Sequence, residues 1–205
     1  MPDQADEKAT ARSRFVNNRR ALGNRERARQ SAAAVRRLLA EPRLTSADTV
    51  AAYWPLGTEP DTRPLIRALL ERGARVLLPV LLPDRDLDWA RYDGDPAALA
   101  GGGAGTRQPQ GTALGVDAVL RARVVIIPAL AVTATGVRIG RGGGSYDRVL
   151  SRIAAAAAAG ESVPWTCAFL YGDELGTLDP AAVEPHDRAV DAACAGSRLV
   201  DFHSL

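Results

Sequence analysis

Short apolar runs alternate with helical segments along most of the chain, and this alternation limits the folds open to it. Residues 49–55 ("TVAAYWP") and 74–82 ("ARVLLPVLL") are predicted to be buried strands, with a helix over residues 63–73 between them. The same patterns predict strands at 87–92, 122–130 and 165–171, a helix at 145–159 and a last short strand in the tail. Apolar strands joined by helices are typical of a mostly parallel sheet covered on both faces. We therefore predict a single α/β domain over residues 1–205.

The first forty residues are rich in alanine and arginine and predict a helical segment over about residues 6–40. A break is expected at Leu22-Gly23-Asn24, and Pro42 ends the segment. Apolar positions in its second half recur every three or four residues, so the arginines are expected mostly on the solvent-facing side. This concentration of arginine is the one compositional hint of an anionic partner.

The remaining composition narrows the class of protein. The net charge is only +2 and aromatic residues make up 5%, which leaves few stacking surfaces for a nucleic acid. No apolar run approaches the roughly 20 residues that span a bilayer, and no secretory signal is visible. Cys167 and Cys194 are far apart and lack C-x-x-C spacing, so we expect neither a zinc site nor a disulfide, and a reducing cytoplasm.

The stretch "RIGRGGGSYDRVLSRI", residues 138–153, places glycines at positions 140, 142, 143 and 144 directly before a helix. Uncovered backbone N–H groups, the helix N-terminus and the guanidinium groups of Arg138 and Arg141 together predict a cradle for phosphate. Asp147 would repel a polyphosphate unless a cation lay between them, which favours Mg²⁺. The alternative is an ordinary tight turn in which Asp147 complements the helix dipole.

The segment "IIPALAVTATGVRIGRGGGSYDRVL" resembles the signature of the 5-formyltetrahydrofolate cyclo-ligase family, in which "P-x-L-A-F" precedes "R-L-G-R-G-G-G-Y-Y-D-R". Three further stretches resemble the family in the same order: "KATAR", "YWPLGTEPDTRPLI" and "VEPHDRAVD". The resemblance implies conversion of 5-formyltetrahydrofolate to 5,10-methenyltetrahydrofolate with ATP and Mg²⁺, releasing ADP and phosphate. Two alternatives stay open: a related phosphotransferase acting on another formyl or carboxyl compound, and a non-enzymatic nucleotide- or RNA-binding module.

The resemblance also implies roles for individual residues. Lys8 and Arg12, four apart on one helix face, match residues that hold the nucleotide phosphates. Asp147 and Asp187 match the Mg²⁺ ligands, and Arg141 and Asp147 are the expected catalytic residues. The remaining nucleotide-binding positions are Arg138, Gly140, Arg141, Gly142, Gly143, Gly144, Ser145 and Tyr146, and the folate-binding positions are Trp54, Glu59, Gly142 and Tyr146.

Each of these residues also has an ordinary structural interpretation: Trp54 as core packing, Glu59 as a turn residue, and His186, beside Asp187, as a structural histidine. Ser145 and Gln108 depart from the family, which has a tyrosine and a glutamate at these positions. The long glycine-rich stretch 94–115 is expected to be a loop near the folate. We expect Asp147→Ala to abolish turnover and leave the fold intact, and we expect a monomer or weak dimer that binds neither nucleic acid nor membrane.

Overall fold

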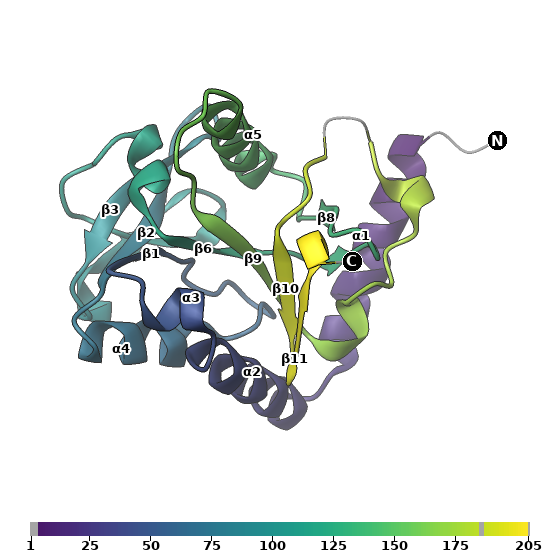
Figure 1. The fold of residues 1–205 in the computed structure, drawn as a ribbon. Helices are drawn as coiled ribbons and strands as arrows, with labels where there is room; N and C mark the ends of the chain where they lie inside the picture. The colour runs from purple at the N-terminus through teal and green to yellow at the C-terminus, as the bar shows by residue number, and fades with distance from the viewer. Residues whose placement is uncertain (1–3, 185–186, 205) are drawn as a thin grey trace.

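A computed structural model describes residues 4–184 and 187–204 and contains a seven-stranded mixed sheet (Figure 1). The strand order is β11-β10-β9-β6-β1-β2-β3; the five central strands run parallel, and β3 and β11 are antiparallel at the two edges. The strands are β1 (Thr49–Ala51), β2 (Arg75–Leu81), β3 (Leu87–Tyr92), β6 (Val124–Pro128), β9 (Trp165–Leu170), β10 (Ala192–Ala195) and β11 (Arg198–Asp201). The α/β class, the mostly parallel sheet and its approximate strand positions are confirmed.

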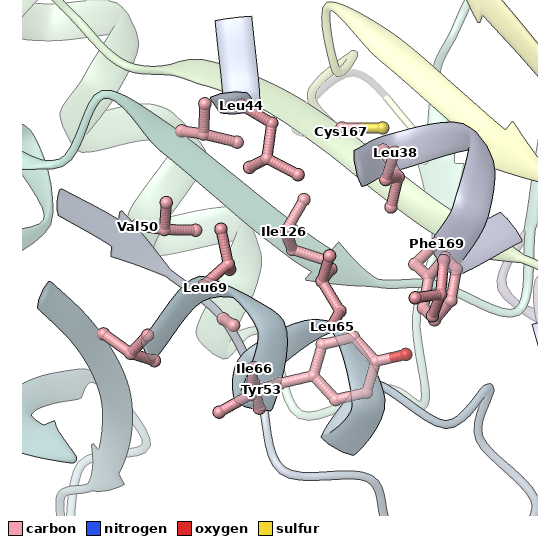
Figure 2. Close-up of a cluster of buried hydrophobic side chains, with 14 of the residues drawn as sticks. Leu38, Leu44, Val50, Tyr53, Leu65, Ile66, Leu69, Ile126, Cys167 and Phe169 are labelled. Atoms are coloured by element: carbon pink, nitrogen blue, oxygen red, sulfur yellow. The ribbon is translucent and has the colours of Figure 1, made fainter. Parts of the chain in front are cut away.

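Helices cover both faces of the sheet, as predicted (Figure 1). One face carries α2 (Asn24–Leu39), α3 (Pro42–Thr45) and α4 (Arg63–Glu71), and the other carries α5 (Ser145–Ala158) and the 3-10 helix η3 (Val116–Arg121). Alternate residues of β6 point to opposite faces, so Ile126 packs with α2 and α4 while Val125 and Ile127 pack on the α5 side. Figure 2 shows the first of these cores, with Ile126 among the leucines of α2 and α4.

The stretch 94–115 is more ordered than the predicted loop. It contains the hairpin β4 (Leu99–Gly101) and β5 (Arg107–Pro109), together with the short 3-10 helices η1 (Pro96–Ala98) and η2 (Gly103–Gly105). The Gln108 side-chain oxygen accepts a hydrogen bond from the Leu81 N–H at 3.1 Å, which ties the hairpin to β2. The prediction of a loop was therefore wrong over residues 99–109, because three-residue strands are too short to show an alternating pattern.

The N-terminal segment breaks where predicted, since α1 (Gln4–Ala21) ends one residue before Leu22 and α2 begins after Gly23. Helix α1 packs outside the two main layers, beside the short hairpin β7 (Ala131–Val132) and β8 (Arg138–Ile139) and the 3-10 helix η5 (Pro180–Ala182) (Figure 1). Arg19 is 1% exposed, an exception to the expectation of solvent-facing arginines.

Two smaller differences concern the ends of strands and the tail. The predicted strand 49–55 is paired only over Thr49–Ala51, and the tail contributes the hairpin β10–β11 rather than one strand. No helix in the two described ranges combines the length and apolarity that a bilayer crossing requires. His186 lies outside the described residues.

Candidate functional site

The glycine-rich loop joins β8 to α5, and two of its glycines have backbone angles that other residues rarely adopt. Gly142 has φ 94° and Gly144, the residue capping the start of α5, has φ 73°. A Cβ added to Gly140 would lie 3.0 Å from Nη1 of Arg138, closer than most real contacts. The loop therefore needs glycine at these positions for its path, and α5 begins at Ser145 directly after it.

Arg138 and Asp147, both predicted to face the ligand, are paired with each other. Nη2 of Arg138 donates to Oδ1 of Asp147 at 2.8 Å, and the Arg138 side chain is 2% exposed while that of Asp147 is 27% exposed. Burial lowers the pKa of Arg138, and the negative charge of Asp147 opposes that shift. Nε of Arg138 is buried and has no hydrogen-bond partner among the described residues.

Lys8 on α1 meets the segment that precedes β10. Its Nζ donates to Oε2 of Glu184 at 2.5 Å and to both carboxylate oxygens of Asp187 at 2.7 Å. The Glu184 backbone N–H donates to Oδ2 of Asp187 at 2.8 Å, so this carboxylate has a main-chain partner as well as Lys8. Lys8 lies in helix α1 and is 4% exposed, so it is both ordered and buried.

Arg12, one helical turn after Lys8, reaches the glycine loop. Its Nε donates to the Gly140 carbonyl at 3.2 Å, and its Cζ would lie 3.6 Å from a Cβ placed on Gly142. Helix α1 therefore contacts the loop through Arg12 and the Glu184–Asp187 segment through Lys8. The negative charge of Asp187 also acts to raise the pKa of Arg138, more weakly than that of Asp147.

Glu59 is presented by the turn after β1. Its Oε2 accepts from the Leu56 N–H at 2.8 Å, and its Oε1 lies 3.8 Å from Nη1 of Arg141. Burial raises the pKa of Glu59, while the Leu56 hydrogen bond and the Arg141 charge oppose the rise. The Glu59 side chain is 11% exposed and that of Arg141 is 54% exposed, so the pair lies at the border between interior and solvent.

The Tyr146 hydroxyl completes this part of the site. It is buried with no hydrogen-bond partner among the described residues, and burial, followed by the charge of Glu59, raises its pKa well above the ordinary tyrosine value. The Arg138 guanidinium carbon lies 6.0 Å from the centre of its ring. Buried polar groups are normally hydrogen-bonded, so this hydroxyl is an exception that marks the region as a candidate binding site.

The remaining predicted positions are placed as follows. The ring of Trp54 packs edge-on against Tyr92 with centroids 5.6 Å apart, and Trp54 contacts the core on the α2–α4 side. Ser145 starts α5, with its hydroxyl 3.6 Å from where a Cβ of Gly143 would lie. These contacts thus join the predicted nucleotide residues and Glu59 into one region, whereas the contacts of Trp54 are with the core.

Sequence reasoning missed a buried ion pair beside this region, between Arg19 of α1 and Glu174 of the 3-10 helix η4 (Gly172–Glu174). The signal was present in the spacing of α1. Lys8, Ala11, Phe15 and Arg19 lie three or four residues apart and form its buried face.

Among the described residues of this region, the candidate metal ligands are pairs of carboxylates. Among the described residues, no group of three or more histidine, cysteine, aspartate or glutamate side chains is arranged to hold a metal. Mg²⁺ is commonly held by one or two carboxylates together with substrate phosphates and waters, so a complete protein cage is not needed. Part of the Asp147 carboxylate is exposed, whereas the Asp187 side chain is 4% exposed and both of its oxygens accept hydrogen bonds from Lys8.

Comparisons with known proteins agree with one another. The model of the 5-formyltetrahydrofolate cyclo-ligase family matches residues 4–196. A 5-formyltetrahydrofolate cyclo-ligase of Mycolicibacterium smegmatis is 38% identical over 188 residues, covering 89% of this chain and 90% of that protein. The enzyme of the same name from Escherichia coli K12 is 34% identical over 134 residues, covering 64% of this chain and 73% of its own.

Two solved structures share the fold. The NMR structure of Aquifex aeolicus 5,10-methenyltetrahydrofolate synthetase superposes with a TM-score of 0.78 at 23% identity, covering 95% of this chain and 92% of that one. A 5,10-methenyltetrahydrofolate synthetase from Mycoplasma pneumoniae gives a TM-score of 0.69 at 16% identity, covering 93% and 99%.

Proposed function

Since the chain belongs to the 5-formyltetrahydrofolate cyclo-ligase family and carries that ATP-using ligase activity, we propose that its nucleotide site is the region between α1, the glycine loop and the Glu184–Asp187 segment. The observation that supports this proposal is the convergence of Lys8, Arg12 and Arg138 on three carboxylates and a glycine turn. Three cations, uncovered main-chain N–H groups and a helix N-terminus make this region suited to a triphosphate.

The reaction has two bond-making steps. The formyl oxygen of 5-formyltetrahydrofolate attacks the γ-phosphorus of ATP, and the bond to the β-phosphate breaks to release ADP. N10 of the folate then attacks the activated formyl carbon, the carbon–oxygen bond breaks to release phosphate, and N10 loses its proton as the methenyl ring closes. Phosphoryl transfer of this kind depends mainly on positioning and charge stabilisation.

Each side chain has a proposed part in these steps. Lys8 and Arg12 hold the phosphates from α1, and Arg141, the most exposed arginine of the loop region, closes on the γ-phosphate as charge moves between oxygens. The main-chain N–H groups of residues 140–144, together with Ser145 and Tyr146 at the start of α5, bind the phosphates from the other side. Arg138 lies beneath the loop and orients Asp147 through their ion pair.

Asp147 and Asp187 would hold Mg²⁺. When bound, the ion supplies positive charge that offsets the phosphate charge during transfer. Without a cation, Asp147 would face the phosphates as an uncompensated negative charge. Its pairing with Arg138 lessens this repulsion but leaves part of the carboxylate exposed to solvent.

Glu59 is the proposed anchor for the folate, with Tyr146 and the Gly142 backbone beside it and Trp54 as a ring surface. A carboxylate accepts hydrogen bonds from the donor edge of a pterin, and Glu59 already accepts one from the Leu56 N–H. The Tyr146 hydroxyl, buried without a partner among the described residues, is free to donate to the substrate. Arg141 lies between Glu59 and the glycine loop and therefore borders both ligands.

A direct experiment tests this proposal: purified protein is mixed with 5-formyltetrahydrofolate and ATP, and absorbance of the methenyl product is followed with Mg²⁺ and with Mg²⁺ chelated. We expect turnover only with Mg²⁺, and calorimetric binding of Mg-ATP that is weakened in Lys8→Ala and Arg12→Ala. Equal turnover after chelation would remove the metal from the proposal, and unchanged nucleotide binding in both variants would remove α1 from the site.

The setting of the protein is proposed from the same residues. Cys167 and Cys194 are buried free thiols on neighbouring strands, and burial raises the pKa of both, Cys194 to about 12, which keeps them unreactive and suits a reducing cytoplasm. A monomer or weak dimer stays a prediction, which light scattering after size-exclusion chromatography checks.

A further inference from the structure

The inner face of α1 has an unusual composition, because charged side chains occupy both of its ends. Lys8, Ala11, Phe15 and Arg19 are buried along one stripe. Ala11 and Phe15, in the middle, pack in a small apolar cluster with residues such as Leu130. Val16, which is partly buried, packs against the same cluster. Apolar contacts of this kind do little to fix a helix along its own axis, because hydrophobic contact is not directional. Position along the axis must therefore come mainly from the polar ends.

Arg19 lies near the C-terminal end of α1 and forms a bidentate ion pair with Glu174. Nε and Nη2 of Arg19 donate to Oε1 and Oε2 of Glu174 at 2.6 and 2.8 Å, and the two side chains are 2% and 4% exposed. Nη2 of Arg19 also donates to the Ala129 carbonyl at 2.5 Å, and Oε2 of Glu174 accepts from the Tyr171 N–H at 2.9 Å. Both partners are thus tied to backbone as well as to each other.

The backbone partners locate this pair at the carboxyl ends of two central strands. Ala129 follows β6, and Glu174 follows β9 in η4. The chain leaving β6 continues through β7 and β8 to the glycine loop. The Arg19–Glu174 pair therefore fixes one end of α1 to the same edge of the sheet from which the loop is built.

Because an α-helix is rigid, fixing α1 at Arg19 also fixes the residues of α1 that lie at the proposed nucleotide site. Arg12 is seven residues from Arg19 and Lys8 is eleven, so at 1.5 Å per residue they lie about 10 and 16 Å farther along the axis. A shift at Arg19 moves both cations together. Burial lowers the pKa of Arg19, but the hydrogen bond and charge of Glu174 outweigh this effect, so the net shift is upward and Arg19 stays charged.

We propose that Arg19 and Glu174 are a positioning pair that sets the axial position of α1, so that Lys8 and Arg12 meet the nucleotide. This inference rests on the proposed nucleotide role of Lys8 and Arg12. A buried ion pair is a weak source of net stability, because desolvation offsets most of the attraction. Its forked hydrogen bonds instead define one arrangement of the two groups, which suits a positioning role.

The test replaces both members with apolar side chains of similar size, as Arg19→Met with Glu174→Leu, so that no unpaired charge is buried. If the pair positions α1, this double variant folds with a melting temperature near that of the parent, but its KM for ATP rises about tenfold, the loss expected for one misaligned charge-assisted contact. The KM for 5-formyltetrahydrofolate rises less than the KM for ATP: Glu59 has no described hydrogen bond to Arg19 or Glu174, so the loss of Arg19 reaches the Glu59 turn only through its charge and through Tyr171, which donates to the Thr58 carbonyl. Amide exchange within α1 becomes faster.

Matched variants separate the possible causes. Asp48→Leu with Arg75→Met makes the same kind of change in an exposed ion pair at the amino ends of β1 and β2 and is expected to change neither KM. Arg19→Lys, which keeps the charge but replaces the planar forked guanidinium with a single ammonium nitrogen, is expected to fall between the parent and the double variant. If Arg19→Met/Glu174→Leu does not fold, Arg19→Lys carries the test alone.

An unchanged KM for ATP together with unchanged exchange in α1 would overturn the positioning role. Failure of the underlying proposal looks different: Lys8→Ala and Arg12→Ala would then leave the KM for ATP unchanged, while amide exchange in the Arg19–Glu174 variants would still report whether the pair fixes the helix. Equal rises in both KM values would also overturn the inference, since they would indicate a general loss of structure.

Discussion

Because Asp147 pairs with the buried Arg138, Asp147→Ala should cost folding stability in addition to the proposed metal ligand. The Arg138 side chain is 2% exposed, and its Nε already has no partner among the described residues. Removing the carboxylate leaves a buried guanidinium group without its ion pair. The variant is therefore expected to lose both turnover and stability.

The size of the stability loss follows from the two exposures. Breaking a fully buried ion pair by removing one partner costs about 3–5 kcal/mol. Since Asp147 is 27% exposed, water can replace part of the lost interaction, and a loss of about 2 kcal/mol is the better expectation. For a chain of 205 residues this corresponds to a fall of about 4–8 °C in melting temperature.

Asp147→Asn is the matched variant for this experiment. The asparagine oxygen can still accept the 2.8 Å hydrogen bond from Arg138 but carries no charge for a metal. We expect Asp147→Asn to lose roughly half as much melting temperature as Asp147→Ala. Both should lose turnover by at least about a hundredfold in the methenyl absorbance assay.

Thermal unfolding by circular dichroism and the product assay are measured on the same preparations. An alanine variant with the melting temperature of the parent would refute the energetic reasoning about the Arg138–Asp147 pair. Full turnover in either variant would refute the proposed metal role of Asp147, whatever the stability result.

Three further predictions concern the loop and the Glu59 turn. Because burial raises the pKa of Glu59, the folded state holds its carboxyl proton more tightly than the unfolded chain does. The free energy of unfolding should therefore fall as pH rises from the ordinary glutamate pKa to the raised one. Glu59→Gln should lack this part of the pH dependence in thermal unfolding. Arg141→Ala should raise the KM for ATP about tenfold in steady-state kinetics and raise the pKa of Glu59 further, whereas an unchanged KM would exclude Arg141 from the phosphate site. Gly142→Ala should destabilise the protein by about 1 kcal/mol in urea unfolding because of its φ of 94°, and a variant as stable as the parent would show that the loop tolerates a side chain there.

The sheet could be predicted from the sequence because its strands follow a simple rule. A parallel strand covered on both faces must be apolar throughout, and the runs at 122–130 and 165–171 have that pattern. The hairpin β4–β5 escaped detection because its strands have three residues each and lie among glycines. The sequence also indicated that Gly144 directly precedes a helix, and its left-handed backbone conformation explains why glycine is favoured there.

The side-chain pairing in the site could not be predicted in the same way. The motif identified Arg138 and Asp147 as site residues. It did not show that the arginine is buried or that it donates a hydrogen bond to the aspartate nine residues later. The expectation that Asp147→Ala leaves the fold intact changes for that reason. The burial of Arg19 was not predicted, because its partner Glu174 lies 155 residues away and only the fold brings them together.

Lys8 contacts Glu184 and Asp187, which follow it by 176 and 179 positions. During synthesis, Lys8 therefore gains its partners only after the strands up to β9 and the chain through Asp187 have been made. On the proposed assignment, Mg-ATP would protect a chain that contains this segment against unfolding and proteolysis and would give no such protection to a copy terminated before residue 184.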